Sequence, residues 1–153
     1  MFVGQHHHTL DTKKRLVIPS KFRLSFEAGE NEGIYVSLHT VKHTGTSLSY
    51  LNLYPPSAWT KLLERIEKIA VSSEKATWYL RKLSADTEFC HLDPQWRILI
   101  PLRLIKGADL KRDIMIIGGN DHIEVWCIEK WQQISYWLNE HTSEFEKDIY
   151  RTI

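Results

Sequence analysis

The chain of 153 residues has few cysteines, little excess of charge of either sign and no long apolar run. Its only cysteines, Cys90 and Cys127, stand alone without a CxxC pair, which suits buried packing residues in a reducing cytoplasm. No apolar segment is long enough to cross a bilayer, and the first residues lack the basic start and apolar core of a secretory signal. We therefore expect a cytoplasmic protein without a membrane partner.

The charge balance restricts how the chain could bind nucleic acid. Its net charge is only +1, which argues against a protein that coats nucleic acid through bulk charge. Any affinity for DNA must come from local basic clusters or from many copies acting together. The composition, 42% hydrophobic and 25% charged, is otherwise that of a globular protein.

A stretch near the start of the chain recurs near its middle. Residues 10–19, with the sequence LDTKKRLVIP, correspond to residues 92–101, with the sequence LDPQWRILIP. A second correspondence follows each copy, between residues 51–59 and residues 123–131. The chain is therefore two versions of one unit, of which the first carries about ten extra residues. A unit of this size has little core of its own, so we expect the two halves to pack closely together.

Apolar runs that end at prolines or turn residues predict the secondary structure. Strands are expected at 1–10, 16–18, 34–38, 48–54, 89–92, 98–100, 114–117 and 122–127. Brief helices are expected at 19–26 and 101–106, a long helical stretch at 58–82 that Ser72 and Ser73 kink or break, and a helix at 131–138 with a polar helical tail. The polar segment 39–47 is expected to be a loop that contains the surplus residues of the first half. The units are then 1–57 and 87–131, joined by a helical segment at 58–86 and followed by a helical tail at 132–153.

Each repeat carries an aspartate and an arginine four positions apart, before a short apolar strand. Aspartate at the start of a tight loop accepts hydrogen bonds from backbone N–H groups further along, so we expect Asp11 and Asp93 to shape the loops. The arginines, Arg15 and Arg97, either fold back on the aspartate as an ion pair or offer their planar fork to a phosphate or a guanine edge. The ordinary alternative is a helical acid–base pair, which the flanking strand-like residues and prolines disfavour.

The first copy of the motif is the more basic one. Between positions 11 and 25, Asp11 is the only acid, and the cations are Lys13, Lys14, Arg15, Lys21 and Arg23. Lysines at a loop tip supply phosphate affinity without sequence choice, whereas arginine adds base readout. We expect the first loop to supply most of the electrostatic attraction, since the second has only Arg97 and, further on, Arg103.

These motifs resemble a known family. Met1, Phe2 and Gly4, together with the segment HTLDTKKRLVIPSKFR at 8–23, resemble the N-terminus of the MraZ family. That family consists of bacterial transcriptional regulators built from two SpoVT/AbrB-type domains, each with a D-x-x-x-R motif. The resemblance covers nearly the whole chain, because the second motif and the strands at 51–54 and 125–126 also fall where the family has them.

The resemblance implies a mainly β fold with short helices, in which two swapped-hairpin units form a double-split β-barrel. It also implies ring-shaped homo-oligomers that bind double-stranded DNA at short direct repeats upstream of a division and cell-wall gene cluster, in association with the nucleoid. In such proteins the motif arginines and nearby lysines touch DNA, which maps onto Lys13, Arg15 and Arg97 here.

The chain departs from the family pattern just before each arginine. Glycine is usual there, but this chain has Lys14 and Trp96. Glycine readily adopts a positive φ angle, whereas lysine and tryptophan do so at a cost in free energy. An extra phosphate contact by Lys14 would compensate, while Trp96 either packs sideways on the fold or stacks against a neighbouring subunit. The second loop therefore has two alternative roles, contact with DNA or a structural role.

The other residue groups in the sequence do not indicate a metal site, a phosphate-binding loop or a catalytic site. Adjacent histidines on a strand face opposite sides, so among His6, His7 and His8 only the outer two could share a metal ion, and two ligands make no site. Gly118 and Gly119 suit a hairpin turn, without the pattern of a phosphate loop. No local signature of an activated nucleophile appears. We therefore expect no enzyme, no cofactor, no metal and no small-molecule substrate.

The sequence thus predicts an oligomeric, sequence-specific DNA-binding regulator of transcription. An assembly module with the same fold and no affinity for DNA is the alternative. A small hydrolase would need an apolar cleft with converging polar groups, and nothing in the sequence locates one.

Overall fold

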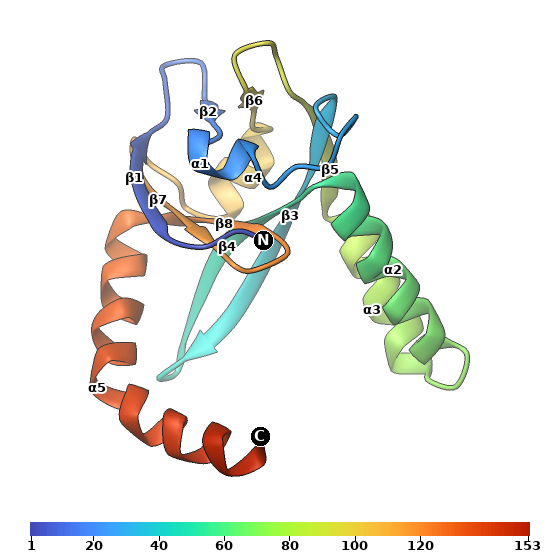
Figure 1. Cartoon of the computed structure of the whole chain (residues 1–153), viewed down its shortest axis with the longest axis vertical. Coiled ribbons are helices and arrows are strands. Elements are labelled where there is room, and N and C mark those ends of the chain that lie inside the picture. Colours follow the sequence, from blue (N-terminus) through green and yellow to red (C-terminus); the bar gives the residue numbers. More distant parts are fainter.

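Strands from the two halves of the chain are interleaved in one antiparallel sheet. The computed structural model describes residues 1–153, and its six-stranded sheet has the order β1-β7-β8-β4-β3-β5 (Figure 1). These strands are β1 (Gln5–Thr9), β3 (Gly33–His43), β4 (Thr46–Tyr54), β5 (Thr87–His91), β7 (Asp113–Gly118) and β8 (Ile123–Cys127). The remaining two strands, β2 (Arg15–Val17) and β6 (Arg97–Leu99), form a separate two-stranded ladder.

Each half contributes an edge strand to the hairpin of the other half. Strand β1 pairs with β7 of the second half, and β5 pairs with β3 of the first half. The two hairpins meet at the centre of the sheet, where β4 pairs with β8. Read from its other end, the sheet has the same order with the halves exchanged, so the sequence repeat appears in space as a pseudo-two-fold axis. Neither half could form its part of the sheet alone.

The expected architecture of antiparallel strands with short helices is confirmed, but the finer prediction of a double-split barrel is not established. The strand pairing leaves an open sheet with β1 and β5 at its edges, and no closed barrel is found. The short helices α1 (Ser20–Arg23) and α4 (Leu102–Gly107) begin directly after Pro19 and Pro101. Proline suits this position because its fixed φ is helical and its missing N–H is not needed there.

The longer helices extend away from the sheet (Figure 1). Helices α2 (Pro56–Ala70) and α3 (Glu74–Ala85) form an arm on one side, and α5 (Ile128–Thr152) runs along the other. The predicted break at Ser72 and Ser73 is confirmed: the Ser73 side chain accepts a hydrogen bond from the Ala76 N–H at 3.3 Å and caps α3. No helix of the chain combines the length and the apolar character that crossing a bilayer requires.

The prediction of a polar loop at 39–47 is wrong, because these residues lengthen the β3–β4 hairpin. The strands continue to His43 and Thr46 around a tight turn at Thr44 and Gly45, both of which have positive φ. One face of this extension packs against α5, where the rings of His43 and Trp137 lie 4.7 Å apart. The polar side chains that suggested a loop lie mainly on the other face, so their alternation with Val41 and Leu48 is the signal of a strand.

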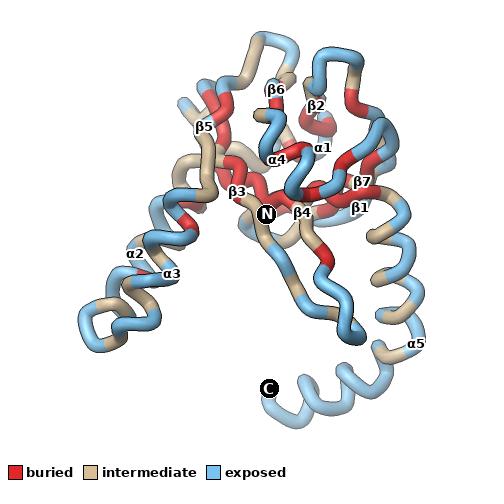
Figure 2. The backbone as a smooth tube through the Cα atoms, turned by 180° about the vertical axis from the view of Figure 1, so that it is seen from behind, coloured by how far each residue is buried: buried red, intermediate tan, exposed pale blue.

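The main core lies between the sheet and the β2–β6 ladder. Figure 2 shows the buried residues concentrated there, while the helical arms are mostly exposed. Leu16 and Ile98 pair at the centre of the ladder and are completely buried. Cys90 and Cys127 are free and buried, as expected, and burial raises the pKa of the Cys90 thiol to about 11. The ladder is thus part of the hydrophobic core that joins the two halves.

Truncation of a ladder side chain tests this role. Leu16 is 0% exposed, whereas Leu99 on the partner strand is 61% exposed. We expect Leu16→Ala to lower the free energy of unfolding by about 2–5 kcal/mol, because it leaves a cavity in the core. Leu99→Ala should change it by about 0.5 kcal/mol or less. Urea unfolding followed by circular dichroism measures both values, and equal losses would contradict the proposed core.

Candidate nucleic-acid interface

The two D-x-x-x-R loops form two arches at one end of the molecule (Figure 1). The first connects β1 to β2, and the second connects β5 to β6. The ladder continues into both arches, because the Ile18 N–H donates to the Trp96 carbonyl at 2.9 Å and the Ile100 N–H donates to the Lys14 carbonyl at 3.2 Å. Each half of the chain therefore hydrogen-bonds to the loop of the other half, which holds the two loops in one arrangement.

An aspartate braces the first loop from inside. One oxygen of Asp11, Oδ1, accepts hydrogen bonds from the backbone N–H groups of Lys13 and Arg15, both at 2.9 Å. The other oxygen, Oδ2, accepts a hydrogen bond from the Arg15 Nε at 2.6 Å. The carboxylate thus shapes the turn and orients the guanidinium group at the same time.

The second loop repeats this geometry. Asp93 accepts from the backbone N–H groups of Gln95 and Arg97, both at 2.9 Å, and from the Arg97 Nε at 2.7 Å. Of the two arrangements that the sequence left open for the arginines, both loops show the ion pair. It uses only the Nε edge, and the terminal guanidinium nitrogens of Arg15 and Arg97 make no hydrogen bond within the chain. The two side chains are 31% and 29% exposed, so neither is sealed inside the molecule.

These contacts also keep both aspartates charged. The backbone N–H of Arg15 is the main cause of a lowered pKa at Asp11, with further hydrogen bonds from the Arg15 guanidinium and the Lys13 N–H, while burial opposes the shift. At Asp93 burial is the largest influence and acts upward, but the hydrogen bonds from Arg97 and Gln95 outweigh it and lower the pKa. Both braces therefore persist at neutral pH.

The residues that replace glycine adopt the predicted positive φ, at 64° for Lys14 and 59° for Trp96, but their side chains differ in use. Lys14 is exposed at the tip of the first loop beside the exposed Lys13. Trp96 instead packs on the core, edge-on to the ring of Phe26 at 5.1 Å, with the Arg23 guanidinium carbon 5.9 Å above it. The same backbone shape therefore presents a cation in one half and a packing residue in the other.

The remaining basic candidates lie on helix α1, which follows β2. Lys21 is exposed on α1, while Arg23 is partly buried and donates from Nε to the Ile18 carbonyl at 3.0 Å.

Among the three histidines of β1, His7 points away from the other two and contacts Asp113 at 3.2 Å. His6 and His8 lie on the opposite face of β1, and no group of three potential metal ligands occurs in the chain.

Arg112 is a cation near the first loop that the sequence analysis did not identify as a candidate. Arg112 precedes β7, and its carbonyl accepts a hydrogen bond from the Leu10 N–H at 2.9 Å. Its exposed side chain lines the same hollow as Thr12 and Lys14. Only the exchange of edge strands, which pairs Thr9 with Asp113, brings it there. In the sequence, only the swapped hairpins implied by the family resemblance could have indicated that Arg112 lies near the first loop.

Comparison with known proteins places this geometry in a family. The family described as "MraZ protein, putative antitoxin-like" matches residues 1–82 and again residues 83–151. The chain belongs to the MraZ family. The resemblance seen in the sequence is thereby confirmed.

Several relatives are named "Transcriptional regulator MraZ". The relative from Clostridium acetobutylicum is 35% identical over 131 residues, which cover 86% of this chain and 84% of the relative. That from Lachnoclostridium phytofermentans is 34% identical over 149 residues, covering 95% and 97%. That from Roseiflexus sp. is 32% identical over 149 residues, covering 97% and 96%. The similarity to MraZ proteins therefore includes both loops.

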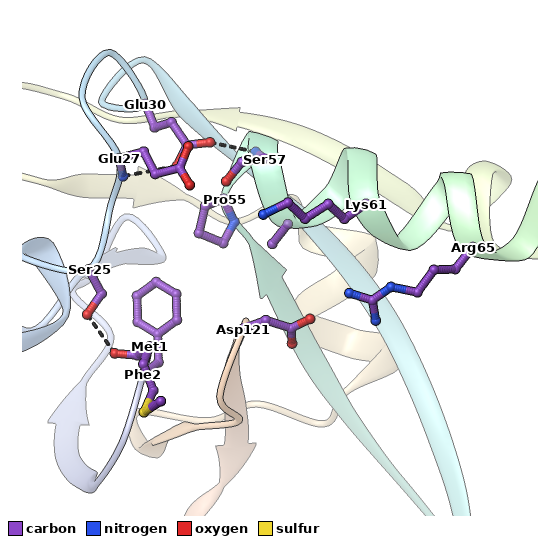
Figure 3. Close-up of a pocket in the computed structure, with 11 residues that line it drawn as sticks. Met1, Phe2, Ser25, Glu27, Glu30, Pro55, Ser57, Lys61, Arg65 and Asp121 are labelled. Atoms are coloured by element: carbon purple, nitrogen blue, oxygen red, sulfur yellow. Dashed lines mark hydrogen bonds between the residues drawn. The ribbon is translucent and has the colours of Figure 1, made fainter.

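A different hollow lies where α2 begins, away from the loops (Figure 3). Its polar groups largely serve the structure: Glu30 accepts hydrogen bonds from the backbone N–H groups of Ser57 and Glu27, and the Ser25 hydroxyl donates to the Met1 carbonyl at 2.6 Å. These bonds tie the N-terminus and the segment after α1 to α2. Lys61 and Arg65 border the hollow from α2, and neither serine hydroxyl that lines it donates a hydrogen bond to a carboxylate.

Glycine substitutions test whether Lys14 and Trp96, the two loop residues with positive φ, contribute differently to stability. Lys14→Gly should change the free energy of unfolding by about 1 kcal/mol or less, because relief of the positive φ offsets the flexibility that glycine adds. Trp96→Gly should lower it by more, on the order of 2 kcal/mol, because the packing on Phe26 is lost. Chemical denaturation measures both. Equal effects at the two positions would mean that Trp96 contributes no packing.

Proposed function

We propose that the chain is a DNA-binding regulator of transcription whose first loop contacts the duplex. The observation that carries the proposal is the cluster of Lys13, Lys14 and Arg15 on one braced arch at an end of the molecule. The names of the MraZ relatives support a role in transcription. Because the loop is held by hydrogen bonds before any ligand arrives, little ordering is needed on binding.

The side chains of this surface have different tasks. Asp11 holds the Nε edge of Arg15, so the free end of the guanidinium group can contact a phosphate or the edge of a guanine. Lys13 and Lys14 contact phosphates, and Lys21 and Arg23 contact the flanking backbone of the DNA. Arg97 adds a lesser contact, because Asp93 braces it in the same way but no lysine lies beside it.

Several copies must act together for tight binding. The net charge of +1 gives a single subunit weak attraction to DNA, whereas subunits of a ring-like homo-oligomer on successive direct repeats gain from a high effective concentration. Sites upstream of a division and cell-wall gene cluster fit such a regulator, which would lie with the nucleoid in the cytoplasm. The swapped-hairpin units would form the double-split barrel of the family, with the domain limits 1–57 and 87–131.

An assembly module without affinity for DNA is the second candidate. It is favoured by the exposed apolar side chains along α5, among them Tyr136, Ile149 and Tyr150, which are 69%, 58% and 70% exposed. Such residues suit contacts between subunits. The two candidates share the fold and differ in what the first loop binds.

Substitution of the two arginines separates these candidates. Arg15→Ala should weaken binding to a duplex from the region upstream of the chain's own gene by about tenfold or more, because one bidentate contact and its base discrimination are lost. Arg97→Ala is the matched comparison, since it removes an equivalent ion pair from the loop that lacks lysines, and it should weaken binding less than Arg15→Ala does. A mobility-shift titration, repeated at several salt concentrations, measures both effects.

The wild-type affinity should fall steeply as salt increases, as contacts to phosphate require. Circular dichroism should show an unchanged fold for both variants. If Arg15→Ala binds as well as the wild type, the first loop does not read DNA. If the wild type shows no binding even at low salt, the DNA-binding function is refuted and the assembly module is the remaining candidate.

A further inference from the structure

Equivalent hollows lie beside the two loops, but their linings differ in charge. The first is lined by Thr9, Leu10, Asp11, Thr12, Lys14 and Arg112. The second is lined by Asn31, Leu92, Asp93, Pro94 and Trp96. The repeat relates the two hollows: Leu10 corresponds to Leu92 and Asp11 to Asp93, while Lys14 corresponds to Trp96. One hollow therefore contains two cations and the other contains none.

The difference extends to the strand that each half receives from the other. The Leu10 N–H donates to the carbonyl of Arg112 at 2.9 Å, and the Leu92 N–H donates to the carbonyl of Glu32, also at 2.9 Å. Arg112 and Glu32 thus occupy equivalent positions just before β7 and β3. A cation stands beside the first loop where an anion stands beside the second.

The cations of the first hollow are free to bind an anion. Lys14 and Arg112 are exposed and form no ion pair within the chain. The two acids nearby are already engaged, since Asp11 contacts Arg15 at 2.6 Å and Asp113 contacts His7 at 3.2 Å. Thr12 lies on the same hollow and supplies a hydroxyl donor.

The second hollow lacks each of these features. Trp96 is turned toward Phe26 in the core, and Pro94 has no backbone N–H to donate. Glu32 is exposed at the position of Arg112 and would repel a phosphate. The aspartate brace is the same in both loops, so the residues around it decide which hollow suits an anion.

We propose that the hollow lined by Thr12, Lys14 and Arg112 binds a phosphate of the DNA backbone. This inference rests on the proposed function and makes it more specific. Each subunit then contacts DNA through one surface built from both halves of the chain, with Arg112 supplied by the second half. The second loop has no such phosphate site: Arg97 adds only its lesser contact, and the loop serves mainly to hold the first loop through the β2–β6 ladder.

Neutralisation of Arg112 tests the proposal. Arg112→Gln is compared with Arg151→Gln, which removes the same charge from an exposed position near the end of α5. Binding to a fluorescent duplex of random sequence is measured by anisotropy over a range of salt concentrations, because a phosphate contact does not depend on sequence. Arg112→Gln should bind several-fold more weakly, with a logarithmic salt slope shallower by about one. Arg151→Gln should match the wild type.

Arg112→Lys provides the complementary measurement, because it keeps the charge and should retain most of the salt slope. Circular dichroism checks that each variant is folded. If Arg112→Gln and Arg151→Gln behave alike while the wild type binds DNA, the phosphate site is refuted and the proposed function stands. If the wild type does not bind the duplex at low salt, both are refuted.

Discussion

The pairing of Leu16 with Ile98 in the β2–β6 ladder is the contact on which the positions of both loops depend. It is completely buried and lies at the centre of a short ladder whose ends continue into the loops of the opposite half. The edge strands are exchanged as well, so each half needs the other to complete its sheet. A repeated unit too small to have a stable core of its own is thereby folded, and the same contacts fix the two arches at one end of the molecule.

The pseudo-symmetric frame carries an asymmetric surface. Both loops have the same brace, an aspartate that accepts two backbone N–H groups and one arginine Nε. The side chains around the braces have diverged, with lysines at the first loop and a core-facing tryptophan at the second. The residues at the tips can diverge because the aspartate and the ladder hold the backbone in the same way in both halves. A chain with almost no net charge can in this way concentrate its cations where they are useful.

Local sequence patterns predicted a large part of this structure. The repeat, the aspartate-led loops and the break between α2 and α3 follow from residue types at fixed spacings. The left-handed conformation of Lys14 and Trp96 follows instead from the family resemblance, because glycine is usual at these positions in the family. The segment 39–47 was predicted wrongly because its polar residues hide the alternation of Val41 and Leu48, whose apolar partner is the distant helix α5. Arg112 could not be found from spacing, since its place beside Leu10 depends on pairing between strands far apart in the chain.

Amide hydrogen exchange of the full-length chain, with and without bound duplex, tests most directly whether one composite surface contacts DNA. The account predicts slower exchange on binding for residues 10–15 and also for residues 110–113, two segments that only strand exchange places together. Residues 92–97 should change much less. Slower exchange confined to residues 92–97, or equal in both loops, would contradict the account.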